Sequence, residues 1–129
     1  MYQRIIIIGN LGRDPEMRYT PDGNAVTSFS VATSRKYKEI NETTWFRVTV
    51  WGKQAESCNQ YLKKGSKVLV EGRLVPDLET GGPKVFQRKD NTYGASFEIS
   101  AMTVRFLSSR VETAEGEDVS SVDEDEIPF

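Results

Sequence analysis

Histidine is absent from this sequence of 129 residues, and cysteine occurs once, as Cys58. Without histidine the chain lacks the side chain that most often serves as a general acid or base and as a metal ligand. A single cysteine forms no internal disulfide, and alone it builds no thiolate zinc site. We therefore expect no enzyme activity, no bound metal and no cofactor, with Cys58 as a small core residue.

Long hydrophobic runs are also missing, since the longest runs only from Ile5 to Ile8. A membrane-spanning helix needs about 20 consecutive apolar residues, and no secretion signal precedes the run. Apolar residues make up 37% of the chain and charged residues 28%, which is ordinary for a globular domain. We therefore expect a soluble cytoplasmic protein that does not bind membranes.

Basic residues are missing from the end of the chain. After Arg110 the sequence has eight carboxylates and no lysine or arginine, so all 17 basic residues and the other 11 acidic residues precede it. The formal net charge of −2 therefore hides a body near +6 and a C-terminal segment near −8. A basic body favours a polyanion such as nucleic acid, which the acidic segment would repel.

Short β-type segments dominate the body. We expect five strands over residues 2–11, 25–34, 44–52, 67–74 and 92–107. A loop or hairpin connection over 13–24, a hairpin loop over 35–43 and a long loop over 75–91 are expected between them. The four isoleucines show no alternation, which indicates a strand buried on both faces. A change of phase in the last strand predicts a β-bulge near Ala101.

One segment, residues 53–65, has helical periodicity. Ala55, Cys58 and Leu62 recur on one side and are expected to pack inward. Lys63 and Lys64 are expected in the last turn, where cations favour the helix dipole, with Gly65 as the stop. A helix between the third and fourth of five short strands predicts an all-β fold, a five-stranded Greek-key OB-fold barrel.

The strand over residues 44–52 carries two different faces, because successive strand side chains point in opposite directions. One face carries Phe46, Val48 and Val50, and the other carries Trp45, Arg47, Thr49 and Trp51. Buried tryptophan is common, so packing of both rings in a core or a subunit interface is the alternative. A face that mixes tryptophan with arginine and threonine is a poor core, but it suits the stacking of bases beside a phosphate.

Two basic segments contain further aromatic residues, Tyr37 in SRKYK and Phe86 in KVFQRK. We predict that both rings stack on the bases of a single strand. We also predict phosphate contacts for the following basic side chains: Arg4, Arg18, Arg35, Lys36, Arg47, Lys53, Arg73 and Arg88. For each one alone, the alternative is a surface charge exposed to solvent.

The chain ends in SSVDEDEIPF, four uninterrupted carboxylates followed by an apolar tip. Residues 109–122 are expected to be a disordered linker, because they bury too little surface to offset the entropy of ordering. We therefore divide the chain into a domain over 1–108, this linker, and an acidic tip over 123–129. The tip is expected to dock on partner proteins through Asp123, Glu124, Asp125, Glu126, Ile127, Pro128 and Phe129.

Four stretches together resemble bacterial single-stranded DNA-binding proteins: IIIIGNLGRDPEMRYTPDGNAVTSFSVATS, TTWFRVTVWGKQAE, YLKKGSKVLVEGRL and the terminal DEDEIPF. The resemblance covers the whole chain. It implies an OB-fold homotetramer of the bacterial cytoplasm and nucleoid. Such a protein binds single-stranded DNA without sequence preference in replication, recombination and repair. The resemblance further implies base stacking by Tyr37, Trp45 and Trp51, and docking of replication and repair proteins on the acidic tip.

The sequence departs from this family in three places. Tyr37 stands where many members have tryptophan, residues 75–91 lack a tryptophan often found there, and the linker is shorter than in many members. The residues alone leave an RNA-binding module, an oligosaccharide-binding module and a protein-interaction adaptor as alternatives. They also leave open whether Ile5 to Ile8 supply core only or subunit contacts as well.

Overall fold

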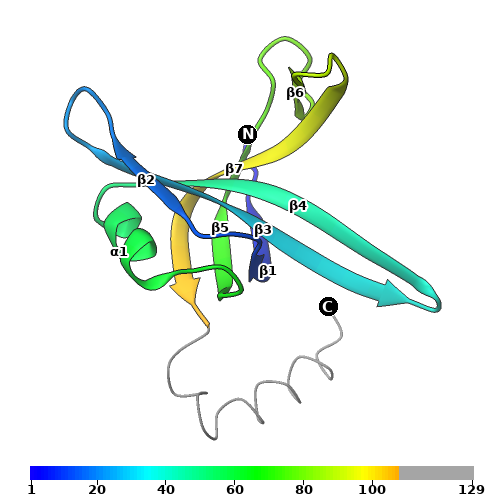
Figure 1. The fold of residues 1–129 in the computed structure, drawn as a ribbon, viewed down its shortest axis with the longest axis horizontal. Coiled ribbons are helices and arrows are strands. Elements are labelled where there is room, and N and C mark those ends of the chain that lie inside the picture. The colour runs from blue at the N-terminus through cyan, green and yellow to red at the C-terminus, as the bar shows by residue number, and fades with distance from the viewer. Residues whose placement is uncertain (108–129) are drawn as a thin grey trace, which may run out of the picture.

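The computed structural model describes residues 1–107 (Figure 1). Its elements are β1 (Ile5–Leu11), β2 (Glu16–Tyr19), β3 (Ala25–Tyr37), β4 (Ile40–Trp51), α1 (Lys53–Tyr61), β5 (Lys67–Val75), β6 (Lys84–Gln87) and β7 (Tyr93–Phe106). The expected linker over 109–122 and acidic tip over 123–129 lie outside the described residues. Within the described part, no helix has the length and apolar character needed to cross a membrane.

Five of the strands close into a barrel. β1 pairs with β5, β5 with β7, β7 with β4, and β4 with β3, while Asn10 and Leu11 of β1 pair with Ala32 and Val31 of β3. β4 and β7 run parallel, and the other barrel pairs are antiparallel. This is the order of a Greek-key OB-fold barrel, and α1 lies between its third and fourth strands. The predicted fold class is therefore confirmed.

The barrel closes where Gly9 of β1 lies against β3. A Cβ on Gly9 would lie 2.3 Å from the carbonyl oxygen of Ala32 and 2.8 Å from Cγ1 of Val31. Both distances are far below the roughly 3.5–4.0 Å at which carbon atoms attract one another. Any larger residue at this position would push β1 away from β3 and open the barrel.

The core is built from the inward faces of these strands and from one side of α1. Val31, Val48, Val50, Val68 and Val70 are fully buried. The predicted inward side of the helix is confirmed, since Ala55 and Cys58 are buried, and Leu62, directly after the helix, is buried as well. Burial raises the pKa of the Cys58 thiol to about 11, so this cysteine stays protonated and unreactive at neutral pH.

Gln54 ties α1 to the predicted β-bulge. The register between β5 and β7 passes from Glu71 and Thr103 to Gly72 and Ala101, so Met102 is the extra residue. The Gln54 amide accepts a hydrogen bond from the Val104 N–H at 2.7 Å and donates one to the Met102 carbonyl at 3.2 Å. The predicted bulge is thus confirmed, and the helix supplies partners for the backbone groups there.

The helix is shorter than predicted. It ends at Tyr61, and Leu62 already has the extended backbone angles φ −94° and ψ 151°. Lys63 and Lys64 therefore do not lie in the last helical turn. The Lys63 N–H instead donates to the Ser66 side chain at 3.1 Å, and the Lys64 N–H donates to Asp14 at 2.8 Å. These bonds satisfy the backbone beyond the helix without another turn.

Two hairpins project beyond the barrel (Figure 1). β3 and β4 continue together to Tyr37 and Ile40 and turn at Lys38, whose φ is 57°. β6 pairs with β7 from Lys84 to Gln87, and β2 pairs with the start of β3. The hairpin connections predicted over 13–24 and 35–43 are therefore present but with shorter loops than predicted, and the prediction of one long loop over 75–91 is wrong. Strands that leave the barrel have little buried face, so they lack the apolar alternation that marks a strand in a sequence.

β1 is buried on one face only. Ile7 and Leu11 point into the core, whereas Ile6 is 59% exposed and Ile8 is 37% exposed. The prediction of burial on both faces is therefore wrong for the single chain. Buried and exposed side chains do alternate along β1, as in any strand with one buried face. The sequence hides this alternation because isoleucine occupies exposed positions as well as buried ones.

Candidate nucleic-acid interface

The side chains of β4 divide between its two faces as predicted. Val48 and Val50 have no exposed surface, whereas Trp45 and Trp51 are each 52% exposed. Arg47 lies between the two tryptophans in the strand and donates a hydrogen bond to the Ser28 hydroxyl at 3.4 Å. Packing of the tryptophans in the core of this domain is thereby excluded.

The outward face of β4 continues across the neighbouring strands. Residues paired in register project from the same side of a sheet. The positions beside Trp45, Arg47 and Thr49 are small or polar: Ala32, Ser30 and Ser28 on β3, and Glu98 and Ser100 on β7. On this face of β4 the two tryptophans and Arg47 are therefore the largest side chains, and most of the side chains that surround them are small or polar.

Two adjoining hollows lie over this face. The larger, of about 370 Å³, is lined by residues that include Trp45, Arg47, Phe86 and Glu98. The smaller, of about 170 Å³, lies over Arg13, Asp14 and Glu16. Ser30 and Arg47 line both hollows, so the two lie side by side. Trp51 lines neither hollow but lies farther along β4 on the same face. We call the two hollows together with the exposed ring of Trp51 the tryptophan groove.

Phe86 reaches the tryptophan groove from a different element. It lies on β6, opposite Gly94 of β7, and is 47% exposed. The Arg88 guanidinium lies 5.4 Å from the centre of its ring and donates to the Tyr93 carbonyl at 2.8 Å. The basic segment around Phe86 thus holds an ordered pair of an aromatic ring and a cation at the groove.

Tyr37 is not brought into the tryptophan groove. It lies six residues after the buried Val31, so strand alternation puts both on the side of β3 opposite Trp45. At the tip of the β3–β4 hairpin its ring is 56% exposed, with the Lys38 amine 5.4 Å from its centre. A strand that contacts both Tyr37 and Trp45 must therefore pass around the hairpin.

Besides Arg47, three of the predicted basic residues share the outward face with the tryptophans. Arg73 pairs with Ser100, which pairs with Thr49. Arg18 pairs with Val26, which pairs with Trp51. Lys36 lies on this side of the hairpin because it is four residues along β3 from Ala32, the partner of Trp45. Lys53, at the start of α1, follows Trp51 by two residues.

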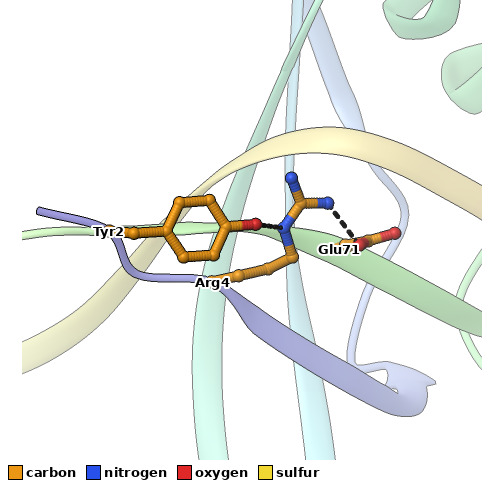
Figure 2. Close-up of polar contacts among 3 residues, drawn as sticks. All are labelled: Tyr2, Arg4 and Glu71. Atoms are coloured by element: carbon orange, nitrogen blue, oxygen red, sulfur yellow. Dashed lines mark hydrogen bonds and ion pairs between the residues drawn. The ribbon is translucent and has the colours of Figure 1, made fainter.

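Arg4 and Arg35 instead pair with carboxylates. Figure 2 shows Arg4 bound to Glu71, and its Nε also donates to the Tyr2 hydroxyl at 2.6 Å. The hydrogen bond to Glu71 is the main cause of a raised Arg4 pKa. Because Glu71 pairs with Ile6, this cluster lies at the exposed isoleucine face, away from the tryptophan groove. Arg35 lies 3.3 Å from Glu42 across the hairpin.

Sequence reasoning missed Glu98 as a groove residue. Glu98 accepts a hydrogen bond from the Ser96 hydroxyl at 3.2 Å and lies 3.8 Å from the Lys84 amine. Its place between Phe97 and Ile99 put it on the outward face of the last strand, a signal available from alternation alone.

A family model described as the single-strand binding protein family matches residues 2–107. The chain belongs to that family. It is 39% identical over 131 aligned positions to the single-stranded DNA-binding protein of Wolinella succinogenes, an alignment that covers 95% of this chain and 76% of that protein. It is 40% identical over 118 positions to the single-stranded DNA-binding proteins of Neisseria meningitidis serogroups A and B, covering 88% of this chain and 64% of theirs.

Replacing the carboxylate of Glu98 tests the electrostatics of the tryptophan groove. Glu98→Gln keeps the size of the side chain but removes a negative charge that would repel phosphates. We expect its affinity for oligo-dT to rise about two- to fivefold at low salt, with a smaller gain at high salt. Fluorescence titration at two salt concentrations measures this, with Glu79→Gln, in the β5–β6 connection, as the control. Equal affinities of Glu98→Gln and the native protein would show that the strand does not pass Glu98.

Proposed function

We propose that this chain binds single-stranded DNA in the tryptophan groove, without sequence preference and without catalysis. The observation that carries the proposal is a half-exposed pair, Trp45 and Trp51, on an outward sheet face with Arg47 between them. Aromatic rings stack on every kind of base, at roughly 1–3 kcal/mol per base, so such a face binds a strand regardless of sequence. The names of the relatives favour DNA over RNA or oligosaccharide as the ligand.

Basic side chains around the groove are proposed to pair with the phosphates. Arg47 lies within it, Arg88 lies beside Phe86, and Arg18, Lys36 and Arg73 share its side of the sheet. Each phosphate neutralised releases counterions, so the logarithm of affinity should fall by about 0.7 per decade of salt for each contact. Arg4 and Arg35 are weaker candidates, because each already pairs with a carboxylate.

Alanine substitutions separate stacking from charge pairing. We expect Trp45→Ala and Trp51→Ala each to lower oligo-dT affinity by about 5- to 100-fold. The salt dependence should stay unchanged, because stacking releases no counterions. Anisotropy of a labelled oligo-dT at several salt concentrations measures both quantities. Tyr61→Ala, which removes an exposed ring on α1, is the control. Equal losses in all three variants would contradict a groove on the tryptophan face.

We propose that the chain assembles as a homotetramer and that the outer face of β1 supplies subunit contacts. Ile6 and Ile8 are exposed there, and Ile8 pairs in register with Leu69. The Arg4–Glu71 pair borders the same face. An exposed apolar surface rimmed by charged residues is typical of an interface between proteins.

A charge on the isoleucine face should break the assembly. Ile6→Asp is expected to yield smaller species by sedimentation velocity at micromolar concentration, with the β-sheet signal in circular dichroism retained because Ile6 lies outside the core. Ile40→Asp is a matched control, since Ile40 is also 59% exposed but lies at the hairpin tip. A native protein that sediments as a monomer would contradict the tetramer. Loss of assembly in the control would contradict the assignment of this face.

We propose that residues 123–129 recruit replication and repair proteins. Support comes from the sequence, in which four carboxylates adjoin Ile127, Pro128 and Phe129. Carboxylates steer the encounter with a basic partner, and the apolar residues fill a pocket on it. Neither a solubility tail nor a linker requires that apolar ending.

Deleting residues 127–129 should abolish recruitment and leave oligo-dT affinity within about twofold of the native value. Immobilised native and deleted proteins are compared for capture of replication and repair proteins from a bacterial extract, identified by mass spectrometry. Deletion of residues 119–121 is the control for a change in length. If the protein lacking residues 127–129 captured the same replication and repair proteins, the docking proposal would be wrong.

A further inference from the structure

Two glycines lie directly against the outer edge of an aromatic ring of the tryptophan groove. A Cβ on Gly12 would lie 2.6 Å from Cζ3 and 2.7 Å from Cη2 of Trp45. A Cβ on Gly94 would lie 2.7 Å from Cζ of Phe86 and 2.5 Å from Nη2 of Arg88. Carbon atoms pack at about 3.5–4.0 Å, so each ring occupies space that a side chain on the glycine would take.

Backbone conformation does not explain these two glycines. The positive φ angles among glycines of residues 1–107 belong to Gly23, Gly52, Gly65 and Gly81, where an added Cβ would meet open space. Elsewhere in that range an added Cβ would meet backbone or aliphatic atoms or a hydroxyl. At Gly12 and Gly94 alone it would meet an aromatic ring. The missing side chain at these positions therefore serves the rings.

The backbone beside each ring is held in place. The Gly12 N–H donates to the Ser30 carbonyl at 3.1 Å, which fixes it against the β3 residue that lines both hollows. Gly94 lies within β7 and pairs with Phe86. A side chain added at either position would displace the ring, since strand pairing and this hydrogen bond restrain the backbone from receding.

We propose that Gly12 and Gly94 are positioning residues for strand binding, each a seat that holds one stacking ring in its binding orientation. The inference rests on the proposed function. A ring that is already ordered loses less conformational entropy when a base stacks on it, so a seated ring binds more tightly than a mobile one. Ala at either position would lift the ring from its seat and remove this advantage.

A double-mutant cycle separates a seat from a merely structural glycine. We expect Gly12→Ala to weaken oligo-dT binding about three- to tenfold, measured by anisotropy of the labelled oligonucleotide. In a Trp45→Ala background the same change should alter affinity by less than about twofold, because the ring it displaces is gone. Gly94→Ala with Phe86→Ala forms a second cycle, made in an Arg88→Ala background because a Cβ on Gly94 would also displace the Arg88 guanidinium. Gly82→Ala is the control, because its Cβ would meet only the Thr80 hydroxyl at an ordinary 3.7 Å.

A second measurement reads the seat without DNA. The chain has two tryptophans, so Trp51→Phe leaves Trp45 as the only one. Gly12→Ala in that background should change the emission maximum and anisotropy of Trp45 in the free protein. This keeps the two proposals apart: if the native protein does not bind oligo-dT, the proposed function fails, whereas the emission of Trp45 still reports whether Gly12 seats the ring.

Three results would overturn the inference. The first is an affinity of Gly12→Ala equal to that of the native protein, and the second is an equal loss with and without Trp45. The third is an unchanged Trp45 emission. If Gly12→Ala does not fold, the Gly94 and Phe86 cycle decides, and equal losses by Gly94→Ala with and without Phe86 would overturn the inference for that seat.

Discussion

Alternation along β4 ties the binding surface to the folding of the barrel. Val48 and Val50 lose all their exposed surface between β3 and β7, while Trp45 and Trp51 stay half exposed. A slip of one residue would bury Arg47 and both tryptophans and expose the valines, at a cost of several kcal/mol. The burial that stabilises the barrel therefore also fixes the direction of the rings. Neighbouring strands complete the surface, since β3 supplies small residues and β6 brings Phe86 to the same groove.

Much of this arrangement was predictable from local sequence. The two faces of β4, the buried side of α1 and the bulge in β7 all follow from spacing along single segments with one buried face. The order of the five barrel strands and the helix along the chain follows from those segments together. The family membership was also predictable from motifs, three of which lie within residues 2–107, where the family model matches.

The remaining features depend on pairing between distant segments, which spacing along one segment does not show. The β3–β4 and β6–β7 hairpins extend past the core, and the parts of their strands outside the core carry no apolar alternation. Arg4 is drawn to Glu71 by the β1–β5 register, and Tyr37 is placed opposite Trp45 by the number of residues in the hairpin. The contacts of Gly12 and Gly94 with aromatic rings likewise join residues 33 and 8 positions apart.

Photo-crosslinking tests the central claim, that single-stranded DNA lies along the tryptophan groove. An oligo-dT in which bromodeoxyuridine replaces some thymidines crosslinks to aromatic side chains stacked on its bases, and mass spectrometry identifies the residues. The account predicts crosslinks to Trp45, Trp51 and Phe86. Crosslinks confined to the segment that precedes β1, at Tyr2 for example, would contradict it.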